Sequence, residues 1–230
     1  MLANDSTRKR RSSPRTPSHE RAIERYETLL DSVDALLRTH DPDDIGLYQI
    51  AEHAEVPNAS IYHFFPTKDA AFLGLVQRYL KGFAQLKNAP VPAEYLYSWQ
   101  GVIDWDLKRS VKFYHEHTPA MKLFLGQYGG IETSRAEAVY HEKMASQAYR
   151  RLEQYFEMPK LRDAAKLFYI STEIVDAVLS ISYLKFGMIK EEYRLDAFRA
   201  AVAYCRLVLP EITEPKDKPD DRNQTEVEIQ

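Results

Sequence analysis

The chain has 230 residues, of which 44% are hydrophobic and 12% aromatic, enough for a substantial core. Its single cysteine, Cys205, excludes an internal disulfide framework and a zinc site built from several cysteines. The formal net charge is −3, so any binding of nucleic acid must depend on a local excess of basic residues. We expect a soluble cytoplasmic protein, because the apolar runs fall short of the roughly 18 residues that cross a bilayer.

The two ends of the chain carry opposite charge. Residues 1–25 contain seven basic and three acidic side chains, a local excess of +4, whereas residues 210–230 contain three basic and seven acidic ones. Residues 1–17 contain almost nothing apolar, which predicts a disordered basic arm, and residues 211–230 predict a mobile acidic tail. The arginines from Arg8 to Arg15 could follow a DNA backbone or enter a minor groove, or they could only keep the chain soluble.

Low glycine content and apolar residues with a period of 3.6 predict an all-α protein of about nine helices. The first helix follows the arm and ends before Asp41 and Pro42, because proline cannot continue a helix. Two very short helices come next, and a fourth begins after Thr67, the expected N-cap, and ends before Asn88. The other predicted helices form a larger bundle and cover residues 93–117, 120–128, 133–157, 160–186 and 190–209.

The two very short helices, 47–54 and 58–65, are joined by a tight turn. The first has apolar residues at positions i, i+3, i+4 and i+7, and the second ends in three apolar residues that can pack back on the first. The opposite side of the second helix carries Asn58, Ser60, Tyr62 and His63. Helices of two turns are not stable alone, so neighbours must hold this pair while one polar face stays free. This pattern predicts a helix-turn-helix whose second helix enters a DNA major groove.

The segment 47–72 resembles the DNA-binding signature of the TetR (tetracycline repressor) family. The residues that carry the resemblance are Ile50, Ala51, Val56, Tyr62, Phe65 and Lys68. Two positions differ: Glu55 stands where the family usually has glycine in the turn, and Gly46 where it usually has threonine. Any left-handed backbone conformation in the turn would therefore have to be adopted by Glu55, which carries a side chain. The resemblance implies a DNA-binding domain of three helices over residues 18–66. It also implies an effector-binding and dimerisation bundle over residues 67–210, which would act as a homodimer.

The residues that we expect to contact DNA are Gly46, Tyr48, Asn58, Ala59, Ser60, Tyr62, His63 and Lys68. Tyr62 and Lys68 align with family positions that contact the DNA backbone. A lysine in the first turn of a helix opposes the helix dipole, and a bound phosphate would reconcile the two. The alternative is a solvated polar face without a partner.

Residues 93–157 hold many large rings, most of which we expect in the core. A few could line an effector pocket, as the resemblance favours. The candidates are Trp105, Phe113, Phe124, Tyr128, Tyr140, Met144 and Asp176. Asp176 stands among apolar residues, so it must meet a partner across a dimer interface, a ligand, or water at a helix edge.

His115 and His117 point about 200° apart on a helix and cannot share an ion, so with no other ligand set we expect no metal and no cofactor. The sequence lacks an ordered nucleophile and base, so we expect no enzyme. The resemblance implies a ligand-responsive transcriptional regulator, usually a repressor, released from a palindromic operator by a small apolar or aromatic effector. Its partners would be double-stranded DNA and a second copy, bound through residues 160–186 and 190–209. The alternatives are a helical-bundle enzyme and an effector-free DNA-organising protein.

Overall fold

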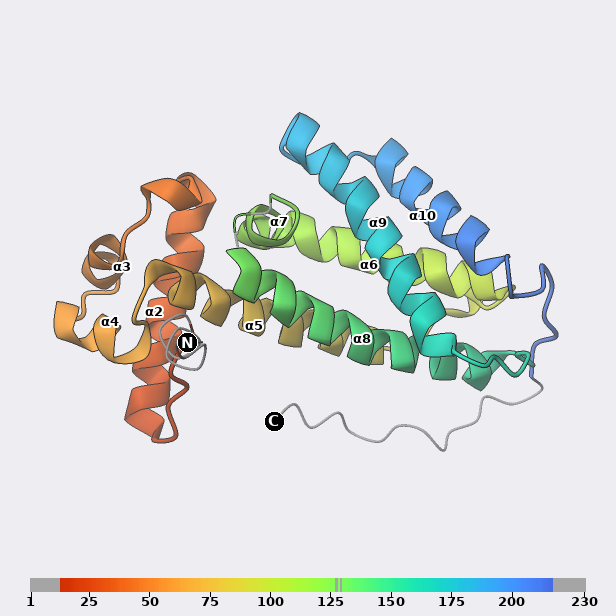
Figure 1. The fold of residues 1–230 in the computed structure, drawn as a ribbon, viewed down its shortest axis with the longest axis horizontal. Helices are drawn as coiled ribbons and strands as arrows, with labels where there is room; N and C mark the ends of the chain where they lie inside the picture. The colour runs from red at the N-terminus through yellow and green to blue at the C-terminus, as the bar shows by residue number, and fades with distance from the viewer. Residues whose placement is uncertain (1–12, 127, 129, 217–230) are drawn as a thin grey trace, which may run out of the picture. The chain divides into compact units, whose positions relative to one another are not determined.

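A computed structural model describes residues 13–126, 128 and 130–216. These residues form α-helices joined by short turns, with two 3-10 turns and no β-strand beyond one isolated bridge (Figure 1). The chain divides into two compact units, described here one at a time. Unit 1 comprises Met1–Leu80 and His117–Ala136, and unit 2 comprises Lys81–Glu116 and Glu137–Gln230. The all-α prediction is therefore confirmed for the described residues.

Unit 1 holds the predicted helix-turn-helix. Its elements are α2 (Glu20–Thr39), η1 (Pro42–Asp44), α3 (Leu47–His53), α4 (Asn58–Phe64), the first part of α5 (Lys68–Asn88), α7 (Thr118–Phe124) and the first turns of α8 (Gly130–Tyr155). The apolar stripes face inward, so that Leu30 of α2, Ile50 of α3 and Ile61 of α4 are almost completely buried. Thr67 caps α5 as predicted, because its hydroxyl accepts a hydrogen bond from the Ala70 N–H at 3.1 Å.

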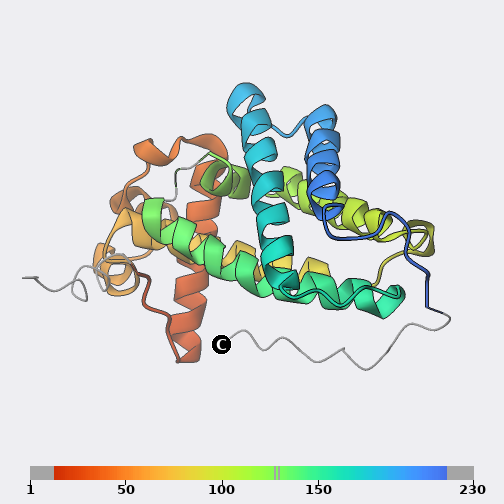
Figure 2. The same ribbon diagram turned by 45° about the vertical axis from the view of Figure 1, so that its right-hand side comes forward.

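Unit 2 contains the larger bundle. Its elements are the end of α5, η2 (Ala93–Tyr95), α6 (Trp99–Glu116), the rest of α8, α9 (Ala164–Phe186) and α10 (Glu191–Cys205). Helices α9 and α10 lie side by side in both ribbon views (Figures 1 and 2). Asp163 caps the start of α9, and Gly187 ends it in a left-handed conformation with φ 70°, as its position predicts.

Several helix boundaries differ from the predictions. Helix α8 begins at Gly130 and not near residue 133, and α9 begins at Ala164 and not at residue 160. Helix α7 ends at Phe124 and not at residue 128, and α10 ends at Cys205 and not at residue 209. Helix α6 begins at Trp99 and not near residue 93, because Ser98 caps it: the Ser98 hydroxyl accepts from the Gly101 N–H at 3.1 Å. Helix α7 begins at Thr118 and not at residue 120, since Pro119 occupies its first turn, where a helix needs no N–H group.

The start of the predicted acidic tail packs against unit 2. The Trp99 indole donates a hydrogen bond to the Pro210 carbonyl oxygen at 2.8 Å, and the Lys216 N–H donates to the Tyr155 carbonyl oxygen at 2.8 Å. Residues 211–216 therefore pack near the start of α6 and the end of α8, whereas the sequence predicted a mobile segment. The remainder of the tail lies outside the described residues.

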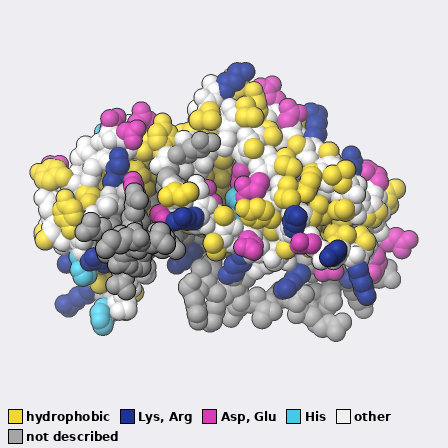
Figure 3. Space-filling view, in the orientation of Figure 1, with side chains coloured by type: hydrophobic (Ala, Val, Ile, Leu, Met, Phe, Trp, Pro, Cys, Tyr) yellow, Lys and Arg dark blue, Asp and Glu magenta, His cyan; other side chains and the backbone are white. Residues whose placement is uncertain are grey.

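Helix α9 corrects one expectation from the sequence. Among the described residues it is the one helix whose length and composition would allow it to span a membrane, and only 28% of its most apolar 18 residues are buried. The large exposed apolar side chains at its end are Ile181, Leu184, Phe186 and Met188. Apolar side chains gather over the region of α9 and α10 in the space-filling view (Figure 3). A core helix of a soluble protein passes the same test of length and composition, but it would normally be covered.

Candidate functional site

The turn between α3 and α4 is closed by main-chain hydrogen bonds. The Val56 N–H donates to the Ala51 carbonyl oxygen at 3.0 Å, and the Glu55 N–H donates to that of Glu52 at 3.1 Å. Glu55 has φ 54° and is the one described non-glycine residue with a positive φ. The backbone of Glu55 thus adopts the left-handed conformation that glycine adopts most easily, as the comparison with the family signature predicts.

The polar face of the helix-turn-helix is open to solvent. The Tyr48 side chain of α3 is 62% exposed and that of Tyr62 of α4 is 54% exposed. Asn58, Ala59 and His63 are also exposed. Gly46 and Ser60 are half-buried, and the Gly46 N–H donates to the Gln49 side chain at 2.6 Å. Seven of the eight predicted DNA-contacting residues therefore lie on or beside the two short helices of unit 1.

The eighth residue, Lys68, has a role inside unit 1. Its ammonium donates a hydrogen bond to the Pro42 carbonyl oxygen at 3.0 Å and lies 3.9 Å from the Asp43 carboxylate. The same group stands 5.9 Å from the centre of the Phe72 ring. Lys68 therefore ties the turn before α3 to the start of α5, a structural role that the sequence analysis did not foresee. Its side chain remains 32% exposed.

Arg15 connects the basic arm to α4. Its N–H donates to the Phe64 carbonyl oxygen at 2.8 Å, and its guanidinium donates to the His63 carbonyl oxygen at 3.4 Å. Both carbonyl groups belong to the last turn of α4, where no intrahelical N–H is available to them. The end of the arm therefore lies beside the last turn of α4, whereas Arg8 and its neighbours lie outside the described residues. The sequence showed that Arg15 is basic, but it did not show that Arg15 contacts α4.

The predicted effector residues are divided between the two units. Phe124 and Tyr128 belong to unit 1, and the other five belong to unit 2. Phe113 is a core residue, since its ring packs 4.3 Å from that of Phe83 and is 9% exposed. Met144 and Tyr140 of α8 are half-buried, as is Trp105 of α6.

Asp176 belongs to an acidic cluster around His141, formed by Glu137, Glu173 and Asp176. The two ring nitrogens of His141 lie 3.0 Å from the Glu173 carboxylate and 3.3 Å from that of Asp176, which joins α8 to α9. Burial, followed by the charges of Asp176 and Glu173, raises the pKa of Glu137 to about 8. Burial and the charge of Asp176 also raise the pKa of Tyr140. Sequence reasoning missed Glu137, although it lies four residues before His141 on the same face of α8.

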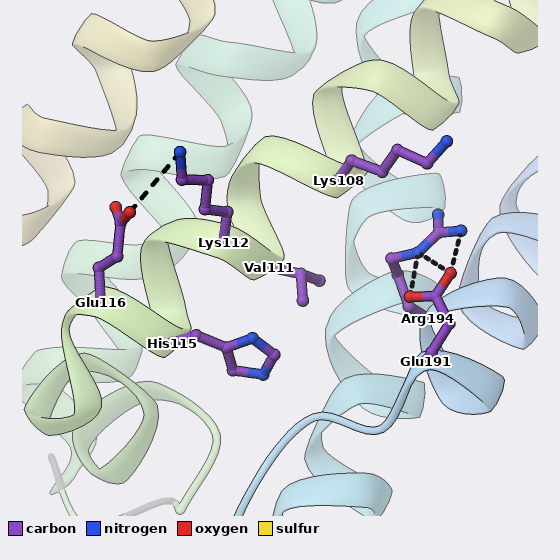
Figure 4. Close-up of a pocket in the computed structure, with 7 residues that line it drawn as sticks. All are labelled: Lys108, Val111, Lys112, His115, Glu116, Glu191 and Arg194. Carbon is purple, nitrogen blue, oxygen red and sulfur yellow. Dashed lines mark hydrogen bonds and ion pairs between the residues drawn. The ribbon is translucent and has the colours of Figure 1, made fainter.

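A surface pocket of about 460 Å³ lies between α6 and the start of α10 (Figure 4). Its lining residues are Lys108, Val111, Lys112, His115, Glu116, Glu191 and Arg194. Arg194 is 3% exposed; its guanidinium donates to Asp104 of α6 at 2.7 Å and to Glu191 at 2.7 to 2.9 Å. Lys108 pairs with Asp104 at 2.9 Å and Lys112 with Glu116 at 3.7 Å. Each Lys and Arg that lines the pocket has a carboxylate partner. The Arg194–Asp104 ion pair joins α10 to α6, and we call these ion pairs the ionic clamp.

Comparison with solved structures shows which known proteins have a similar fold. The fold matches a TetR-family transcriptional regulator from Streptomyces coelicolor over 82% of this chain and 99% of that one, with TM-score 0.63 and 21% identity. It matches a TetR transcriptional regulator from Rhodococcus sp. RHA1 over 83% and 98%, with TM-score 0.60 and 17% identity.

A third match is SmeT, the repressor of the Stenotrophomonas maltophilia multidrug efflux pump SmeDEF. It covers 81% of this chain and 91% of SmeT, with TM-score 0.59 and 16% identity. The chain has the TetR-family fold. No family model and no curated protein matches the sequence, so at these identities the likeness establishes the fold alone. The TetR-like resemblance of residues 47–72 and the TetR fold of the described chain agree with each other.

Proposed function

We propose that this protein is a DNA-binding transcriptional regulator in which α4 enters the major groove. The observation that carries the proposal is the open polar face of a helix-turn-helix on which Tyr48, Asn58, Tyr62 and His63 are all exposed. Hydroxyl, amide and imidazole groups can meet phosphates and base edges. The TetR fold supports this reading, because the matching solved structures are named as transcriptional regulators.

The regulator acts as a homodimer through α9 and α10. Helix α9 is apolar yet mostly uncovered within the protomer, and Ile181 and Leu184 are 55% and 63% exposed. A second copy would bury this surface around a twofold axis. Small residues on α9 and α10 would let a second copy approach closely: Ser182, Ala197 and Ala201 are buried inside the protomer, which leaves Ala177, Ser180, Ala200 and Ala203 for the interface. A twofold dimer requires a palindromic operator with half-sites about 34 to 36 Å apart.

A small effector bound in unit 2 changes the affinity for DNA. Helices α5 and α8 each have residues in both units. A shift of either helix in unit 2 can therefore reach unit 1. We take these helices to have two positions. An effector changes the affinity for DNA only to the extent that it binds one of these positions more tightly than the other. Release from DNA, as in a repressor, is the direction we favour. SmeT is named a repressor, although another protein of this fold, DhaS, is named an operon activator.

Footprinting of the purified protein on genomic DNA tests the proposal. We expect protected palindromic sites, and an affinity that falls at least about tenfold in the variant Tyr62→Ala, since a positioned contact to the backbone is lost. Tyr97→Ala is the matched control, because Tyr97 is 74% exposed but lies in unit 2. A monomer that protects no duplex even at low salt would refute the proposed function.

A further inference from the structure

Two buried hydrogen-bond donors on α6 have no acceptor among the described residues. They are the Trp105 indole N–H and one terminal N–H group, at Nη1, of the Arg109 guanidinium, and both atoms are buried. The residues stand one turn apart on α6, and the guanidinium lies 5.4 Å from the centre of the Trp105 ring. The two donors thus belong to one place in the bundle, although neither uses the hydrogen bond that a buried N–H normally makes.

The charges around Arg109 favour an anion. The charged groups that act on its guanidinium are Asp106, which attracts it, and Arg151, which repels it. Arg151 also lies 3.6 Å from the Asp106 carboxylate and donates to the Ala89 carbonyl oxygen at 2.8 Å. Asp106 and Arg151 act on Arg109 in opposite directions, so their charges offset each other and do not neutralise the positive charge of Arg109. Burial lowers the pKa of Arg109, but a guanidinium does not lose its proton in a protein.

The acidic cluster around His141 does not create the same demand for a cation. Glu137 also has a buried oxygen without a hydrogen-bond partner in the described chain. Its raised pKa of about 8 keeps it protonated and neutral near pH 7, so it does not need a counter-ion. Arg109 cannot become neutral in this way, so its positive charge remains.

We propose that Arg109 and Trp105 bind the carboxylate of an acidic effector. The guanidinium would donate to the carboxylate through Nη1, and the indole N–H would add a further donor with a fixed direction. The Tyr95 ring, 5.0 Å from that of Trp105, extends the aromatic surface beside this group and suits an effector with an apolar or aromatic body. This inference rests on the proposed function, since it names the effector class for the same regulator.

Calorimetric titration with matched probes tests the inference. The probes are benzoate, decanoate and 3-phenylpropionate, with 3-phenylpropan-1-ol and 3-phenylpropylammonium as neutral and cationic analogues. We expect at least one carboxylate to bind and the analogues of 3-phenylpropionate to bind more weakly or not at all. Arg109→Met should weaken carboxylate binding at least about tenfold, the usual effect of losing a charge-assisted hydrogen bond. Trp105→Phe keeps an aromatic ring and should weaken it less.

Arg150→Met is the matched control, because Arg150 is an exposed arginine on α8 and its loss changes the net charge equally. The midpoint of thermal unfolding without a probe gives a second, ligand-independent measurement. Arg109→Met should leave it unchanged or raise it, since Asp106 keeps Arg151 while an unpaired buried charge is removed. A lower midpoint combined with undiminished carboxylate binding would mean that Arg109 is structural, and would overturn the inference.

Equal binding of the alcohol or the ammonium probe, or no binding of any carboxylate at millimolar concentration, would also overturn it. DNA affinity without a probe separates this failure from failure of the proposed function. Arg109→Met should bind DNA as the unsubstituted protein does, because Arg109 lies in unit 2 and the recognition helix α4 in unit 1. A protein that binds carboxylates but no DNA would refute the regulator and leave the carboxylate site standing.

Discussion

Lys122 of α7 donates a hydrogen bond to the carbonyl oxygen of His40, at the C-terminal end of α2, over 2.8 Å. The ammonium also lies 3.9 Å from the Asp41 carboxylate. The last carbonyl groups of a helix lack intrahelical donors and carry the negative end of its dipole, so a lysine there is favourable twice over. Helix α7 is thereby fastened to α2 within unit 1.

Replacing Lys122 by methionine should lower the free energy of unfolding by about 1 kcal/mol, the usual net value of one such hydrogen bond. Chemical denaturation measures the change. Lys143→Met on the exposed side of α8 provides the control and should stay close to the unsubstituted protein. Equal effects of the two substitutions would show that the link between α7 and α2 contributes nothing.

Glu55 holds a left-handed conformation with φ 54°. Glycine adopts this conformation without the steric penalty of a side chain, so Glu55→Gly should raise the free energy of unfolding by up to about 1 kcal/mol. Glu52→Gly, inside α3, should instead lower it by a similar amount. Denaturant midpoints measured for the two variants should therefore move in opposite directions. A loss of stability in Glu55→Gly would contradict the reading of the turn.

Lys68 combines a structural contact with a predicted phosphate contact. If it also meets DNA, Lys68→Ala should weaken binding to all duplexes alike and reduce the slope of log affinity against log salt by about 1. The contact of its ammonium with the Pro42 carbonyl oxygen means that the same variant loses some stability. Binding should therefore be compared well below the unfolding midpoint. An unchanged salt slope would assign Lys68 to the turn alone.

Arg194 is the buried centre of the clamp between α6 and α10. Arg194→Met leaves Asp104 without its closest partner and should lower the free energy of unfolding by about 3 kcal/mol. Arg199→Met, on the same helix but 70% exposed, should change it by less than about 0.5 kcal/mol. Thermal unfolding of both variants gives the comparison. A small effect at Arg194 would mean that hydrophobic contacts alone hold α10.

Glu137 should make stability depend on pH. Its pKa is raised to about 8 in the folded protein from its usual value of 4.5, so between these values the folded state binds more protons than the unfolded state. Stability from this group is therefore full at pH below about 4.5 and is lost as pH rises toward about 8. The charges that face it come from Glu173 and Asp176 of α9.

Replacing Glu137 by glutamine removes the titration and should flatten the fall in denaturation midpoint over this range. Glu142→Gln, at an exposed position of α8, should leave the slope as it was. An unchanged slope in Glu137→Gln would show that Glu137 titrates at an ordinary pKa.

Local patterns predicted the helix-turn-helix closely. Helices 47–53 and 58–64 follow from apolar spacing and from Pro57, because a two-turn helix with one buried edge depends mainly on neighbouring residues. The strained turn at Glu55 was also visible, since it required only comparison with a family signature. The start of α6 was missed, because the period of 3.6 says nothing about which residue caps a helix and Ser98 decides it.

Residues that act through distant contacts were beyond the sequence. Lys68 meets Pro42, 26 residues away, and Arg15 meets His63, 48 residues away. The sequence also did not determine which group Asp176 contacts. The packing of α8 on α9 places His141 beside it.

The amino-acid order by itself determined that the chain is helical, where the two short helices of the helix-turn-helix lie and which of their side chains are polar, because these properties arise within one or two helical turns. Tertiary structure decided which buried charges have partners and which do not. Arg109 and Arg194 both lie on amphipathic helices and look alike in sequence. Only the packing of helices far apart in the chain gives Arg194 the carboxylate of Asp104 and leaves Arg109 with a donor unused, since the balance of buried charge depends on distances in space.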